Sequence, residues 1–267
     1  MMIHNIKRYM RLYRSLISQF MKFIMQSKLD FSMGLFGFFF TQIMGIVFLY
    51  LVFEQIPDLN GWTLEQLIFI YGFAQIPRGI DHLMTDNIWL VAWQHVRNGN
   101  FDRYMLRPMN LFFQVIAEKL QPDALGELLV GTILVIHSVK IGVVEMSPLK
   151  WIMFVISIFA GAVIYTAIKL FFASFAFWMK VSGPVLYTAY ELANFAKYPV
   201  SIYNRAVQLI ITWVIPFAFV AFYPASYFLG MGNIWMVWIE CGIAVVFFVI
   251  AYALFQKGTT VYESAGN

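Results

Sequence analysis

Long apolar runs are the feature that most constrains this chain. Residues 31–53 contain no charged side chain, and residues 151–179 contain only Lys169. At about 1.5 Å per helical residue, either run is long enough to cross a hydrocarbon core of about 30 Å. Backbone polar groups inside a membrane must be bonded within the segment, which favours helices. Charged residues make up 12% of the chain, against roughly 25% in average soluble domains, so the sequence predicts an all-α membrane protein.

The alternation of apolar runs and polar breaks predicts six transmembrane helices within residues 31–255. Residues 1–30 precede them and predict an N-terminal amphipathic interfacial helix, because Lys and Arg share one side and apolar residues the other. Residues 256–267 form a short polar tail. Whether the connection between the fifth and sixth spans re-enters the membrane stays open. The predicted spans are 31–53, 64–93, 124–139, 151–179, 202–223 and 234–255.

The distribution of Lys and Arg predicts the orientation. Fourteen of these residues lie on the side of the two termini, counting the connections after the second and fourth spans, and two, Lys140 and Lys150, lie on the other. Positive residues favour the cytosolic side of a membrane. Both termini and the two large connections are therefore expected in the cytosol.

One cytosolic connection, residues 97–121, is charged and broken into short pieces. Gly99 is expected to end the preceding helix, because glycine adopts the left-handed conformation of a helix C-terminus easily. Pro108 disfavours helix at Arg107, and Asn110 is expected to cap a second short helix. These features predict two short helices lying across the membrane surface between two spans.

Three ionisable residues inside the spans are candidates for the translocation path or a subunit contact. Arg78 and Asp81 are three residues apart on the second span, a spacing at which they can pair with each other. Such a pair would face a substrate path or lock a helix contact. Glu240 lies about 10 Å below the outer end of the sixth span, where a lining role and a local hydrogen bond remain equal alternatives.

The other polar residues of the spans predict no special site. Lys169 is expected to extend its amine to the inner headgroups, and Glu127 is expected to reach the interface. His82 and Asp86 lack further ligands at metal-site spacing, so no metal site is predicted. Cys241 is unpaired within the chain and is expected to pack among apolar residues.

No motif for catalysis or nucleotide binding is present. The chain lacks HExxH, GxSxG and a Walker-type phosphate loop, so it is not expected to be an enzyme or to hold a cofactor. Its basic residues form no patch suited to nucleic acid. Energy for any active process is expected to come from another subunit.

Six stretches, in order along nearly the whole chain, carry a resemblance to a known family. The chain resembles the permease subunits of ABC type-2 exporters, in particular the branch encoded beside a second permease and an ATPase. The tail departs from that pattern, because Lys257 is its only basic residue. The stretches are RLYRSL near the start, GWTLEQL at Gly61, RNGNFDRYMLRPMN at Arg97, YPVSIY at Tyr198, PFAFVAFYPASYFLG at Pro216 and VYESAGN at the end.

The resemblance implies a complex of two permeases, identical or homologous, with two ATPase subunits that bind Mg-ATP. It also implies that the segment from Gly99 to Asn110 is a coupling helix docked on an ATPase. A weaker second candidate for this contact follows the fourth span, at Tyr187, Tyr190, Glu191 and Lys197. The residues of the first candidate are Gly99, Phe101, Asp102, Arg103, Tyr104, Leu106, Arg107, Pro108 and Asn110, with Met105 as a further apolar contact.

The resemblance further implies export of a hydrophobic or amphiphilic substrate across a bacterial inner membrane. Drugs, toxic organic cations, lipids and lipid-linked molecules are all compatible with it. An ion-coupled carrier or channel, an intramembrane transferase or protease, and a membrane anchor for an ATPase are the alternatives. Membrane lipids are the expected surroundings of the chain.

Overall fold

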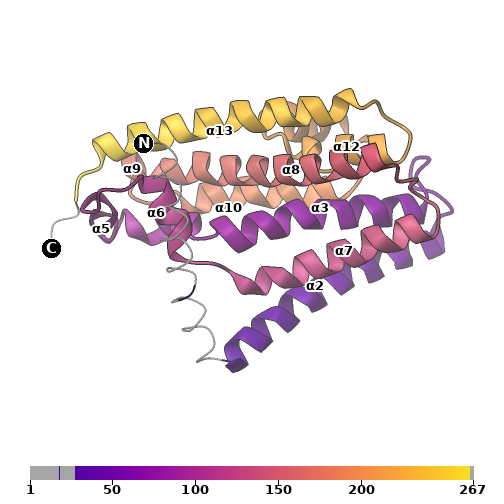
Figure 1. Cartoon of the computed structure of the whole chain (residues 1–267), viewed down its shortest axis with the longest axis horizontal. Helices are drawn as coiled ribbons and strands as arrows, with labels where there is room; N and C mark the ends of the chain where they lie inside the picture. Colours follow the sequence, from indigo (N-terminus) through magenta and orange to yellow (C-terminus); the bar gives the residue numbers. More distant parts are fainter. Residues whose placement is uncertain (1–17, 19–27, 265–267) are drawn as a thin grey trace.

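The computed structural model describes residue 18 and residues 28–264. The predicted interfacial helix, 1–30, lies almost wholly outside these residues. The described part is a bundle of helices without a strand, so the predicted all-α class is confirmed. Long helices run side by side between two ends (Figure 1). One end carries α5 and α6 and is called the α5 end; the other carries α12 and is called the α12 end.

Four helical stretches of the described part are long and apolar enough to cross a membrane. They coincide with the predicted first, third, fourth and sixth spans and extend beyond most of them. A fifth is obtained only if a bent pair of helices, described below, counts as one span. The helices are α2 (Lys28–Gln55), α7 (Leu125–Lys140), α8 (Pro148–Ser174) continued by α9 (Ala176–Met179), and α13 (Trp235–Val261).

Helix α3 (Leu64–Thr85) is mostly buried and packs against both α7 and α8. It begins with a capping box in which Thr63 and Gln66 bond each other's backbone. Beyond Thr85 it is prolonged by α4 (Ile88–Leu90) and a π-helix, Val91–His95. Together these elements cover the predicted second span, 64–93.

Glycines allow α3 to lie against its neighbours. A Cβ on Gly131 of α7 would lie 2.9 Å from the carbonyl oxygen of Gly72, closer than side-chain atoms normally approach. Likewise, a Cβ on Gly161 of α8 would lie 3.0 Å from the ring of Pro77. The absence of these side chains brings the backbones close, as is common between membrane helices.

The connection after α9 differs from the prediction of a cytosolic helix. Its start lies at the α5 end, where the Ser182 amide donates to the Ala92 carbonyl at 3.0 Å. Its far part lies at the start of α3, where the Asn60 amide and the Trp62 indole both donate to Ser201. The connection therefore runs from one end of the bundle to the other, with its first helix packed on α8 and its later part on α3. It contains α10 (Gly183–Glu191) and the 3-10 turns Leu192–Lys197 and Val200–Ile202.

The predicted fifth span, 202–223, does not run the length of the bundle. It starts beside Trp62, bends by 76° at Pro216, and reaches Phe228, whose carbonyl accepts from Lys150 at the start of α8. Both of its ends are at the α12 end, so the segment turns back inside the bundle, and Arg205 lies opposite the α5 end. Pro216 lacks an N–H donor and interrupts the helix. Its pieces are α11 (Arg205–Leu209), the π-helix Ile210–Val214, the 3-10 turn Phe217–Phe219 and α12 (Phe222–Phe228).

Cysteine labelling tests this path. In a Cys241→Ala background, Arg205→Cys should react with a membrane-impermeant maleimide under the same conditions as Glu145→Cys, since both residues are exposed at the α12 end. Lys180→Cys, which is exposed at the α5 end, should show the opposite accessibility in intact and permeabilised cells. If Arg205→Cys instead reacted under the same conditions as Lys180→Cys, residues 202–223 would cross the membrane as the sequence predicts.

Candidate functional site

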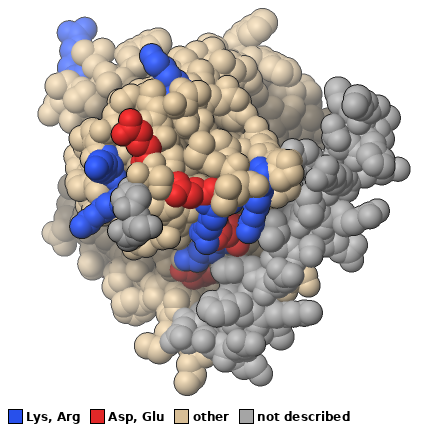
Figure 2. All heavy atoms as spheres, turned by 90° about the vertical axis from the view of Figure 1, so that its left-hand side faces the viewer, with Lys and Arg blue, Asp and Glu red and all other residues tan. Residues whose placement is uncertain are grey.

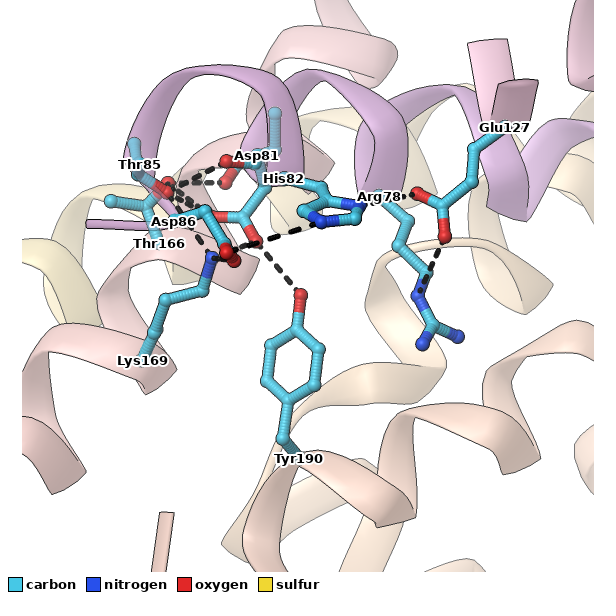
Figure 3. A network of polar contacts seen from close by, with 10 residues as sticks. Arg78, Asp81, His82, Thr85, Asp86, Glu127, Thr166, Lys169 and Tyr190 are labelled. Carbon is cyan, nitrogen blue, oxygen red and sulfur yellow. Dashed lines mark hydrogen bonds and ion pairs between the residues drawn. The ribbon is translucent and has the colours of Figure 1, made fainter. Parts of the chain in front are cut away.

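A network of charged side chains lies inside the bundle, where α3, α7, α8 and α10 meet (Figure 3). Lys169 of α8 and Asp81 of α3 form an ion pair at 2.9 Å, and both side chains are 0% exposed. Three hydroxyl groups donate to the Asp81 carboxylate: those of Thr85 at 2.6 Å, Thr166 at 2.8 Å and Tyr190 at 2.8 Å. Both carboxylate oxygens of Asp81 therefore have bonding partners.

A second cluster adjoins this pair on the next turn of α3. Glu127 of α7 lies 3.6 Å from the Arg78 guanidinium and 3.5 Å from the His82 ring. Asp86 joins the two clusters, since it lies 3.4 Å from the Lys169 amine and 4.0 Å from His82. The network thus holds three carboxylates, two permanent cations and one histidine.

These pairs differ from the prediction that Arg78 and Asp81 bond to each other. Each residue pairs instead with a charge on a neighbouring helix. Lys169 does not reach the headgroups and Glu127 does not reach an interface, because both are buried in the network. Burial of a charge is tolerable where a partner and hydrogen bonds are supplied at the same depth.

Glu240 lies outside this network. Its side chain is 0% exposed and accepts a hydrogen bond from Ser157 of α8. The local hydrogen bond that was one of its two expected roles is present, and the lining or subunit-contact role stays a prediction. The described residues contain no group of three or more His, Cys, Asp or Glu that suits a metal ion.

The network faces a hollow of about 390 Å³ between α3 and α10. Arg78, His82, Asp86 and Glu127 form its polar side. An adjoining hollow of about 420 Å³ shares Arg78 and Glu127 and reaches the α2 helix. The aromatic residues that line the first hollow are Phe38, Trp89, Trp93, Tyr187 and Tyr190.

The second coupling candidate belongs to this interior. Tyr190 bonds Asp81, and the Lys197 amine lies 5.6 Å from the centre of the Tyr71 ring. Tyr187 and Glu191 are exposed at the rim of the hollow. Tyr190 and Lys197 therefore face the interior, while a coupling role for the exposed Tyr187 and Glu191 stays a prediction.

The first coupling candidate lies at the α5 end. Gly99 has a φ of +71°, as expected for the end of a helix, and Asn110 caps α6 (Leu111–Glu118) by accepting from the Phe113 amide. Between them, α5 (Asp102–Met105) is a single turn. Figure 2 looks onto this end and shows Lys and Arg side chains spread over it, with Asp and Glu side chains among them.

Two residues expected to contact a partner point inward instead. Phe101 is 0% exposed and packs edge-on against Phe177 at 4.9 Å and Tyr262 at 5.3 Å between ring centres. We call Phe101, Phe177, Phe255 and Tyr262 the aromatic clamp. Tyr104 is buried as well, and a turn of four residues is too short for its periodicity to reveal which side faces the bundle.

Polar bonds hold the same turn in place. Tyr104 donates to Glu118 of α6, and burial raises the pKa of Tyr104 to about 12, so its hydroxyl keeps its proton. Arg103 pairs with Glu118 at 2.6 Å. On the other side, the Ser264 hydroxyl donates to Asp102. The turn is fixed to both α6 and the end of α13.

The residues that follow are exposed. Leu106 is 85% exposed and Met105 is 48% exposed, and the side chains of Arg107 and Pro108 also face outward. We call residues 105–108 the tip. It is an apolar and basic surface on a rigidly held segment.

Removal of one charge tests the buried pair. Lys169→Met should lower the free energy of unfolding by about 3–5 kcal/mol, because Asp81 is then buried without a counter-charge. A double variant, Lys169→Met with Asp81→Asn, should recover part of the loss. Thermal unfolding in detergent measures both, and Lys180→Met, at an exposed position, is the control. A Lys169→Met protein as stable as that control would contradict the pairing.

Comparison with known proteins supplies a family. No curated protein matches the chain with significant similarity. A family model described as "ABC-2 family transporter protein" matches residues 39–266, which include the buried network, the tip and the lining of the first hollow apart from Phe38. The match covers most of the chain, and the structure adds several long apolar helices. The chain belongs to the ABC-2 family of transporter proteins.

Proposed function

We propose that this chain is the permease subunit of an ABC exporter and that separate ATPase subunits drive it through the tip. The observation that carries the proposal is the exposure of Leu106 on a segment that is otherwise clamped into the bundle. A large apolar side chain exposed at a polar end, with arginines beside it, suits a protein partner.

The aromatic clamp explains how a contact at the tip acts on the membrane helices. Phe101 lies four residues before Met105, the first residue of the tip, and packs on Phe177 of α9 and Phe255 of α13. A displacement of the tip is therefore transmitted to the ends of α8–α9 and α13. ATP binding in the partners would draw the tips of two permeases together and open a path between the subunits.

The charge distribution supports a cytosolic α5 end. Arg97, Arg103, Arg107, Lys180 and Lys257 are exposed there, and positive residues favour the cytosol. Six crossings follow if residues 182–201 count as the fifth and 205–228 as a re-entrant piece. Both termini then face the cytosol, in keeping with a bacterial inner-membrane permease.

The same proposal specifies the other partners of the chain. Two ATPases holding Mg-ATP would bind two permease copies, identical or homologous. The exposed apolar side chains of α2 and α13 suit lipid or the second permease. The polar hollow at membrane depth supports a transport role over a simple anchor, because an anchor needs no charged cavity. Transport that stops with vanadate would separate an ABC exporter from an ion-driven carrier.

Substitutions at the tip test the proposal. Leu106→Ser combined with Met105→Ser should weaken ATPase binding by about 30-fold, as expected for loss of an interface hot spot worth about 2 kcal/mol. The permease should remain in the membrane in normal amount, because both side chains are outside the core. Copurification of the ATPase with a tagged permease measures the effect.

Met231→Ser is the matched control, because Met231 is 53% exposed at the opposite end. It should leave ATPase binding unchanged. If the Met105→Ser, Leu106→Ser variant kept full ATPase binding and transport, the tip would not be the site of ATPase contact. A separate variant, Phe101→Ala, should keep part of the ATPase binding but lose ATP-driven transport. The aromatic clamp passes the movement of the tip to the membrane helices and does not itself contact the ATPase.

A further inference from the structure

We propose that the hollow next to α2, of about 420 Å³, binds the phosphate group of an anionic membrane lipid between Lys197 and Arg78. The lipid is a resident component of the permease that joins α2 to the rest of the bundle, and it is not the cargo. It belongs to the leaflet on the side of the α5 end. Neither transport nor ATPase coupling is needed for this binding.

The distribution of charge points to an anion. Lys169 has two carboxylates of its own, and Arg78 pairs with Glu127. Lys197 lines the hollow but forms no ion pair with any described residue; its amine lies 5.6 Å from the centre of the Tyr71 ring. Counted with Lys197, the cations and carboxylates of the network balance. The positive end of this balanced set lies in the hollow next to α2, where a cation without a partner is costly.

A buried donor without an acceptor lies in the same lining. Gln42 of α2 is 3% exposed and lines the hollow. Its carbonyl oxygen accepts hydrogen bonds from the Tyr71 hydroxyl, at 2.8 Å, and from the Gln75 amide. Within the described part of the chain, its own amide nitrogen donates to no acceptor. Because buried donors are normally bonded, an oxygen of a ligand in the hollow would complete this group.

Arg78 has the donor geometry that suits a phosphate. Its Nη1 atom donates to Asn194 at 3.1 Å, and its Nε atom lies 3.6 Å from the Glu127 carboxylate. Figure 3 shows that its terminal nitrogens point away from Glu127. A guanidinium has further N–H donors in the same plane, and these can bind a phosphate bidentately. The Lys197 amine adds a second positive charge from the turn after α10.

The acidic side chains in the neighbourhood leave this balance unchanged. Glu127 is shared between Arg78 and His82. Glu191 lies at the rim of the other hollow, and Asp123 lies next to α2 outside the lining. Among the described residues, the hollow next to α2 is therefore lined by more positive than negative charge.

The depth of the hollow favours a lipid headgroup over the end of an acyl chain. Gly34 lines it and lies six residues after Lys28, where α2 begins. At 1.5 Å per helical residue this is about 9 Å. Glu127 likewise lies two residues after Leu125, the start of α7. Since lipid phosphates lie just outside the hydrocarbon core, the hollow is within reach of the headgroup region.

Apolar side chains continue from the hollow along α2. Met33 lines the hollow and is 72% exposed, and Phe36 and Phe40 are exposed on the neighbouring face of the helix. Acyl chains can pack on these side chains while the phosphate lies in the hollow. Such a lipid contacts α2 on one side and Lys197 and Arg78 on the other, so it strengthens the attachment of a helix that is otherwise mostly exposed.

Lipid titration of the purified full chain tests the site. Native mass spectrometry in a neutral detergent counts the molecules of dioleoylphosphatidylglycerol retained by the protein; this lipid has a phosphate charge and no compensating cation. The first lipid should bind more tightly than those that follow. Lys197→Gln should weaken this first binding about fivefold, or about 1 kcal/mol, as is usual for a basic side chain facing an anionic headgroup.

A second variant fills the hollow without removing a charge. A Cβ on Gly37 would meet no atom within 4 Å, and Gly37 lines the hollow. Gly37→Leu is therefore compatible with the fold of α2 and places its side chain where the lipid would lie. It should also weaken the first binding at least about fivefold. This variant decides the location even if Lys197→Gln lowers the yield of folded protein.

The controls repeat the same changes elsewhere. Lys180→Gln removes an exposed cation at the α5 end, and Gly242→Leu adds a side chain to α13 at a position where a Cβ also meets no atom within 4 Å. Both variants should bind the lipid like the unchanged protein. Dioleoylphosphatidylcholine, in which a choline cation neutralises the phosphate, should bind about tenfold more weakly.

Thermal unfolding tests the resident role. Dioleoylphosphatidylglycerol should raise the melting temperature of the unchanged protein and of Gly242→Leu, but not that of Gly37→Leu. Binding that leaves the melting temperature of the unchanged protein as it was would overturn the resident role.

The other outcomes are equally decisive. Equal binding of the two lipids would overturn the anionic headgroup, and equal binding by the site variants and their controls would overturn the location. Displacement of the first lipid by inorganic phosphate would assign the site to a free anion instead of a lipid. Persistence of the lipid in the presence of phosphate supports the lipid assignment.

Discussion

The constraint on which this structure depends is the pairing of charges buried at membrane depth. Asp81 with Lys169 and Arg78 with Glu127 join three different helices, and neither pair tolerates a shift of one helix past another without stranding a charge. Apolar packing alone gives membrane helices little preference for one neighbour or register. The ion pairs therefore define the register, and the glycines at the α3 contacts permit the close approach that the pairs require.

The same constraint explains the path of residues 182–201. Tyr190 and Asn194 supply a donor to Asp81 and an acceptor to Arg78, so this polar segment is more stable beside α3 than in lipid. Its presence along α3 leaves the following residues at the α12 end, and they fill the remaining space by turning back at Pro216. Residues 182–201 are interrupted by turns and residues 205–228 are bent at Pro216. Such irregular backbone is tolerated at membrane depth because the surrounding helices shield it from lipid.

Sequence patterns predicted well what depends on local chemistry. The apolar runs indicated α2, α7, α8 and α13, and Gly99 and Asn110 act where their backbone preferences suggested. Pairing partners were not predictable in this way, since the i,i+3 spacing of Arg78 and Asp81 is equally consistent with partners on other helices. The sequence contained one sign of the buried network: Arg78, His82 and Asp86 recur every four residues and form one polar stripe of α3. Lys197 is predicted on the cytosolic side because basic residues between spans usually lie there, but its amine lies 5.6 Å from the centre of the Tyr71 ring of α3.

The clamp at the α5 end has a consequence for biosynthesis. Ser264 and Asp102 lie 162 residues apart in the chain, so the ribosome completes α5 long before it makes the residues that bond it to the end of α13. Until α13 has entered the membrane, Phe101 lacks two of its ring neighbours, and α5 is held by other contacts, among them those with Glu118 and Phe177. The exposed surface of residues 105–108 therefore reaches its final, fully packed form only after the last helix of the chain has been made.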